Sequence, residues 1–77
     1  MIARTKMPNQ MLQRAYDICR EQYEVGGMPT HGSNLAGAFR AGINGQRLNW
    51  PRGTMCWAAY YAGRDIRGEL ALRGVAS

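Results

Sequence analysis

Two short segments made largely of alanine, glycine and aromatic residues constrain the fold of this chain most strongly. Ala36–Gly42 resembles Trp57–Gly63 at an offset of 21 residues, and each segment has an aromatic side chain three positions before a glycine. Small side chains on one helical face allow two helix backbones to approach closely. We therefore predict that the segments lie in two helices that pack as an antiparallel pair. The alternative is a chance similarity within a stretch rich in alanine and glycine.

A further helix is predicted before this pair, and it is expected to close the pair's open side. Residues 8–25 carry apolar side chains at helical spacing, and Gly26-Gly27 end the pattern. Pro8 suits the first position of a helix. The predicted buried face holds Met11, Ala15, Ile18 and Gln22, with Leu12, Cys19 and Tyr23 beside it.

The fold class that follows is all-α, with helices at about 8–25, 34–44 and 54–73. Ser33 or Asn34 would cap the second helix and Thr54 the third. No segment alternates in the manner of a strand. We expect one small three-helix domain over residues 8–74, in which the first helix packs on an antiparallel helix-loop-helix pair. Residues 1–7 would form a flexible basic arm and 75–77 a tail.

The length and the cysteines limit what the domain can contain. At 77 residues only about 60% of the unfolded surface can be buried, so the core is thin. Cys19 and Cys56 follow no apolar leader sequence, and we expect two reduced thiols in a cytoplasmic protein. Two cysteines and the single histidine, His31, are too few for a zinc site. We expect no metal, no cofactor and no membrane partner.

Charge is distributed unevenly along the chain. The formal net charge is +5, and no acidic residue occurs between Val25 and Gly63, whereas Arg40, Arg47 and Arg52 do. Such a cationic segment suits an anionic partner, although it can also be an ordinary solvated face. Asp65 and Glu69 stand one helical turn apart among arginines, a pattern typical of ion pairs on a solvent face.

Residues for catalysis are not grouped in this sequence. His31 has no neighbouring acid, and Cys56 has no recognisable base. The glycines at 42 and 45 lack the Lys-Ser/Thr of a phosphate-binding loop. We therefore expect no enzymatic activity and attribute the conspicuous residues to recognition.

The candidate binding residues gather around the loop between the second and third helices. Arginine contacts phosphate, and bases stack on aromatic rings, but the same residue types also dominate protein interfaces. Trp50 could instead fold back over the core. The candidates are Arg40, Arg47, Asn49, Trp50, Arg52, Tyr60 and Arg64.

Residues 35–65 resemble the ribosome modulation factors, a family of very small basic proteins. Phe39-Arg40-Ala41-Gly42-Ile43-Asn44-Gly45 is similar to the end of that family's first helix, and Trp57 with Tyr61 is similar to the start of its second. Asn49-Trp50-Pro51 stands where the family has a proline followed by an aromatic residue, but here Arg52 follows the proline. The helix over residues 8–25 and the segment after Asp65 are additional to the family pattern. The resemblance implies binding to the ribosome near ribosomal RNA.

The function expected from these features is that of a small basic module that binds the ribosome or RNA and represses its activity. The alternative is a protein-binding inhibitor, of the kind that phages encode, directed at an acidic or nucleic-acid-binding host protein. A dimer is a further possibility, and it would require the Met/Tyr stripe of the first helix to be exposed.

Overall fold

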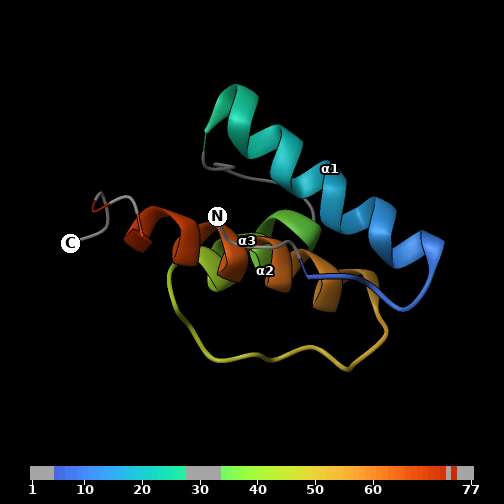
Figure 1. The fold of residues 1–77 in the computed structure, drawn as a ribbon. Coiled ribbons are helices and arrows are strands. Elements are labelled where there is room, and N and C mark those ends of the chain that lie inside the picture. Colours follow the sequence, from blue (N-terminus) through green and yellow to red (C-terminus); the bar gives the residue numbers. More distant parts are fainter. Residues whose placement is uncertain (1–4, 28–33, 73, 75–77) are drawn as a thin grey trace.

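The computed structural model describes residues 5–27, 34–72 and 74. It contains three helices, α1 (Gln10–Gly26), α2 (Asn34–Ile43) and α3 (Met55–Leu72), and the described residues include no strand (Figure 1). Helix α3 packs against both α1 and α2, whereas α1 and α2 meet only marginally. The predicted all-α, three-helix domain is confirmed, and each helix begins and ends within two residues of its predicted bounds.

Side-chain and glycine caps fix the helix ends. The Asn9 side chain accepts a hydrogen bond from the backbone N–H of Leu12 at 2.9 Å, so Asn9 is the N-cap of α1 and Pro8 lies before the helix. The Thr54 hydroxyl caps α3 through the N–H of Trp57, as predicted. At the end of α2, Gly45 adopts φ +74, and the N–H of Gln46 reaches back to the carbonyl of Ala41. Ser33, the alternative cap for α2, lies outside the described residues.

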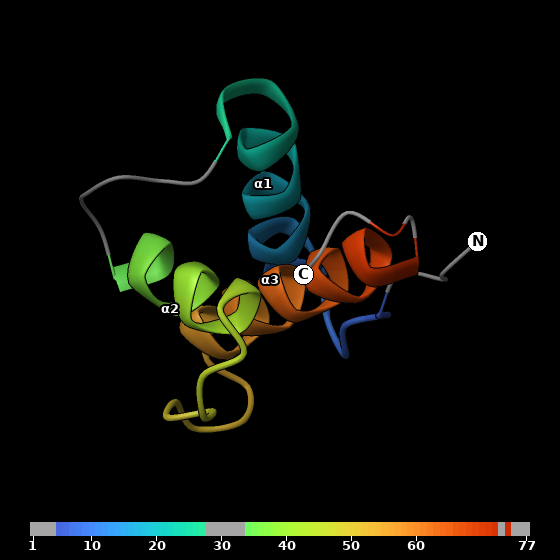
Figure 2. The same ribbon diagram turned by 90° about the vertical axis from the view of Figure 1, so that its left-hand side faces the viewer.

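The relative direction of α2 and α3 differs from the expected antiparallel arrangement. In Figures 1 and 2 both helices run in the same general direction and cross, while residues 44–54 return along α3. The Arg67 guanidinium donates to the Ile43 carbonyl at 3.0 Å, which ties the end of α2 to the second half of α3. Eleven extended residues span up to about 36 Å, which exceeds the roughly 15 Å length of a ten-residue helix. Residues 44–54 are therefore long enough to run from the end of α2 back to the start of α3.

The two helices cross where the repeated segments meet, at Gly42 and Gly63. A Cβ added to Gly42 would lie 2.1 Å from the Tyr60 carbonyl oxygen, and one added to Gly63 would lie 2.2 Å from the Phe39 carbonyl oxygen. The two contacts are related by the same 21-residue offset that relates the segments. The glycines therefore bring the two backbones into direct contact, as the small-residue pattern predicts.

The buried face of α1 is rotated from the predicted one by about one residue. Leu12, Ala15, Tyr16 and Cys19 are buried, whereas Met11 and Ile18 are 56% and 36% exposed. Tyr16 is the reason for the difference, because its ring is fully buried while its hydroxyl donates a hydrogen bond to Asp65 on α3. An aromatic residue with a polar end can thus take a core position that an apolar pattern assigns to methionine.

A polar cluster joins α1, α3 and the chain before α1. The Tyr16 hydroxyl donates to Asp65 Oδ2 at 2.5 Å, and the same carboxylate accepts the backbone N–H of Thr5 at 3.0 Å. Arg20, only 4% exposed, pairs with Glu69. Asp65 and Glu69 therefore turn toward α1. Glu69 does pair with an arginine, but that arginine is buried, so the predicted location of these acids on a solvent face was wrong. The described residues 5–7 of the expected arm are attached here, and Met7 is buried.

The Tyr16 contact predicts a loss of stability at high pH. Burial, and next the Asp65 carboxylate, raise the pKa of Tyr16 to about 12, whereas an unfolded tyrosine titrates near 10. The folded state holds this proton more tightly, so the stabilisation is complete below about pH 10 and is lost as pH rises toward about 12. This difference of about two pKa units corresponds to a loss of roughly 3 kcal/mol in the free energy of unfolding.

Urea denaturation at about pH 9 and about pH 11.5 measures this effect. Cys19 contributes in the same direction, because burial raises its pKa to about 11. The variant Tyr16→Phe therefore serves as the reference, and its free energy of unfolding should fall less with pH than that of the parent chain. Equal pH dependences in the two proteins would contradict the assignment.

Candidate RNA-binding face

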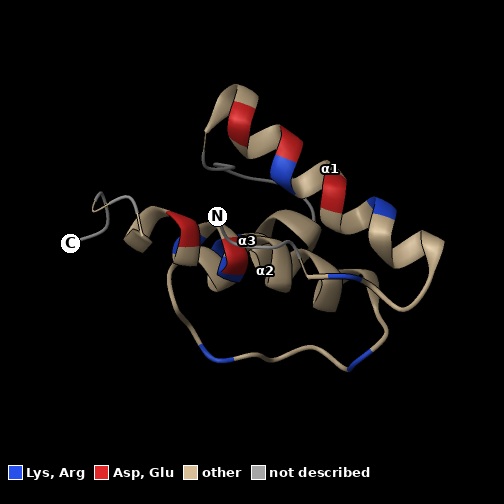
Figure 3. Cartoon of the chain, in the orientation of Figure 1, with Lys and Arg blue, Asp and Glu red and all other residues tan. Residues whose placement is uncertain are grey.

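The segment 44–54 positions most of the candidate binding residues. It leaves α2 at Gly45 and turns into α3 at Gly53, which adopts φ +90. Figure 3 shows basic positions and no acidic ones along this segment, while both acidic and basic positions occur on α1. Arg47, Asn49 and Arg52 are all exposed. The segment therefore presents an unbalanced positive charge to solvent.

The other candidates differ in how far they reach solvent. Arg64 is exposed on α3, whereas Trp50 is half-buried against the core and Tyr60 is only 9% exposed. The Tyr60 hydroxyl donates to the Gln46 carbonyl at 2.6 Å, which holds the segment 44–54 against α3. Arg40 is half-buried, and its Nε has no hydrogen-bond partner among the described residues. Tyr60 thus acts mainly as a support for this face.

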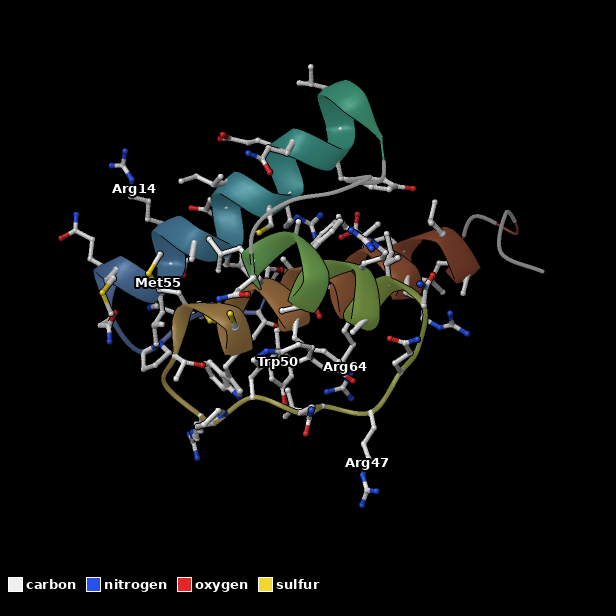
Figure 4. All side chains as sticks on the ribbon, turned by 180° about the vertical axis from the view of Figure 1, so that it is seen from behind. Arg14, Arg47, Trp50, Met55 and Arg64 are labelled. Atoms are coloured by element: carbon white, nitrogen blue, oxygen red, sulfur yellow. The ribbon has the colours of Figure 1, made fainter. Side chains whose placement is uncertain are left out.

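Ring contacts connect the loop to α3. The ring centres of Trp50 and Tyr60 are 6.1 Å apart, and those of Tyr60 and Tyr61 are 5.7 Å apart. The Arg64 guanidinium sits 5.4 Å from the centre of the Tyr61 ring. Figure 4 shows Trp50 and Arg64 between the loop and α3, and Arg47 pointing away from the molecule. We call Arg47, Asn49, Trp50, Arg52 and Arg64 the loop face.

A groove of about 550 Å³ borders the loop face. The Trp57 and Tyr61 rings in it are 5.0 Å apart with an interplanar angle of 62°, so they form a corner and do not stack. Two cations, Lys6 and Arg52, lie at the same groove. Its walls come from three parts of the chain and consist of Thr5, Lys6, Pro8, Leu48, Arg52, Trp57 and Tyr61.

Of these groove residues, only Arg52 is among the binding residues predicted from the sequence. Trp57 resembles a core residue because it stands near a helix start, yet it is only half-buried. Lys6 belongs to the expected arm, and its position depends on the hydrogen bonds of the neighbouring Thr5. The adjacent tyrosines at 60 and 61 supply a signal, since neighbouring side chains on a helix point about 100° apart and these two therefore face different surroundings.

Both cysteines of the chain lie among the described residues. Cys19 and Cys56 are free thiols, and burial raises the pKa of Cys19 to about 11. No group of three or more histidine, cysteine or acidic residues suited to a metal ion occurs among the residues described. None of the helices in those same ranges is both long and apolar enough to cross a membrane.

Comparisons with protein-family models, with curated proteins and with solved structures found no match to this chain.

Proposed function

We propose that the chain is a small non-enzymatic module that binds RNA, with the ribosome as its target, and represses translation. The observation that carries this proposal is the loop face, where exposed arginines lie beside aromatic rings and no acid is present from Val25 to Gly63. Arginine matches the geometry of phosphate and stacks on flat rings, and unpaired bases stack on aromatic side chains. The loop face combines both kinds of contact.

The resemblance of residues 35–65 to ribosome modulation factors supports the ribosome as the target. The shared pattern covers the end of α2, the segment 44–54 and the start of α3. These are the parts that carry the loop face. The additional helix α1 covers α3 on another side, so it leaves this face open.

Sedimentation with ribosomes tests the proposal directly. The purified chain should migrate with ribosomal subunits in a bacterial lysate, and this migration should be lost after RNase treatment. It should also lower the output of a cell-free translation reaction. Migration with a discrete protein complex that survives RNase would contradict the proposal and favour the protein-binding inhibitor.

The double variant Arg47→Ala/Arg52→Ala should bind ribosomal subunits about tenfold more weakly at near-physiological salt. Each lost phosphate contact should also reduce the slope of log affinity against log salt by about one. Both side chains are exposed, so the thermal unfolding midpoint should not change. Binding is measured by sedimentation over a salt series.

Arg14→Ala is the control for a lost charge, because Arg14 is exposed and projects from α1 (Figure 4). It should change neither the affinity nor the salt slope. Equal affinities for the double variant and the parent chain would remove the loop face as the binding site.

A further inference from the structure

We propose that the groove beside the loop face binds one unpaired nucleotide of single-stranded RNA, with its base against Trp57 and Tyr61 and its phosphate at Lys6 and Arg52. This inference rests on the proposed function and identifies which form of RNA the site takes. The groove volume of about 550 Å³ lies in the range of small-molecule sites, roughly 300–1,000 Å³.

The corner between the two rings suits a flat base. The planes of the Trp57 and Tyr61 rings make an angle of 62°. The edge of a base that lies flat against one ring would therefore contact the other ring. Leu48, 37% exposed, supplies apolar surface at the same groove. Arg64 already lies near the Tyr61 ring and adds positive charge beside it. A base paired within a duplex presents only its edges in the grooves, so this corner should discriminate in favour of unpaired bases.

The charges at the groove select a nucleotide over a neutral aromatic ligand. Lys6 is exposed on the described part of the arm, and Arg52 is exposed on the segment 44–54. Thr5 donates its N–H to both Tyr16 and Asp65, and this anchors the chain next to Lys6. The two cations come from positions 46 residues apart in the sequence, and the fold brings them to one groove.

The proposal is tested with a twelve-nucleotide oligo(A) and a duplex of the same length. In a Trp50→Phe background, Trp57 is the only tryptophan, so the fluorescence reports on the groove. Because Trp50 belongs to the loop face, every variant is compared within this background. Oligo(A) should quench this fluorescence, and the duplex should not. Tyr61→Leu should weaken oligo(A) binding about tenfold and leave duplex binding unchanged.

Tyr23→Leu is the matched control, because Tyr23 is another half-buried tyrosine and contacts Phe39, away from the groove. It should not change oligo(A) binding. Lys6→Gln, at an exposed position, should weaken oligo(A) binding and lower the salt slope without a loss of folding.

The outcomes separate the two proposals. Three results together would overturn nucleotide binding in the groove while leaving RNA binding by the loop face intact. These are equal affinities for both RNAs, no change in Trp57 fluorescence and no effect of Tyr61→Leu. Failure to bind either RNA or ribosomal subunits would overturn both.

Discussion

Replacing Gly42 or Gly63 with alanine is expected to destabilise the protein more than any surface change. A Cβ added at Gly42 would lie 2.1 Å from the Tyr60 carbonyl oxygen. A Cβ added at Gly63 would lie 2.2 Å from the Phe39 carbonyl oxygen. A backbone atom cannot rotate away as a side chain can, so α2 and α3 must separate. We expect a loss of about 3 kcal/mol, which is most of the stability of so small a domain.

Thermal unfolding followed by circular dichroism should show a fall in midpoint of about 15 °C for either variant. Gly37→Ala provides the matched control, since Gly37 also lies within α2 and an added Cβ there meets nothing within 4 Å. This control should be stabilised by about 0.5–1 kcal/mol, because alanine favours the helix. Similar midpoints for Gly37→Ala and Gly42→Ala would disprove the close crossing.

Arg20→Met is expected to produce the second large loss. Arg20 is 4% exposed, and its guanidinium pairs with Glu69, whose side chain is 19% exposed. Methionine keeps the apolar length of the side chain but removes the cation that neutralises a mostly buried carboxylate. Breaking such a pair from one side costs about 3 kcal/mol, and urea denaturation would measure it.

A second substitution distinguishes the charge from the packing. Arg20→Met/Glu69→Leu removes both charges and should recover most of the lost stability, because apolar pairs of similar volume can replace buried ion pairs. Arg14→Ala, on the exposed side of the same helix, should have almost no effect. If the double variant were less stable than Arg20→Met, the loss would come from packing and not from the removal of the Arg20 charge beside the Glu69 carboxylate.

The parts of the fold that follow from local chemistry could be predicted. Helical spacing, the Thr54 cap and the glycine-rich repeat fix the three helices and the close contact of α2 with α3. The relative direction of α2 and α3 depends on the path of residues 44–54, which no local sequence pattern predicts. The difference between the predicted and the observed buried face of α1 depends on the hydrogen bond from Tyr16 to Asp65, which is 49 residues away in the sequence.

The candidate site was predictable only where charge and loop position coincide. Arg47, Asn49 and Arg52 are exposed on the segment where the sequence places them. The groove was not predictable, because Lys6, Leu48 and Trp57 become neighbours only through the folding of three separate segments. Trp50 packs against Tyr60 and so belongs partly to the core, which favours the alternative that sequence analysis left open.

The return path of residues 44–54 has an evolutionary consequence. The crossing at Gly42 and Gly63 carries the stability, while Arg47, Asn49 and Arg52 lie exposed on the connecting segment and away from that crossing. Exposed substitutions change stability by about 0.5 kcal/mol or less, and loops tolerate variation that cores do not. Descendants of such a chain can therefore acquire new targets by altering a few codons of the connection, while the scaffold that presents them stays the same.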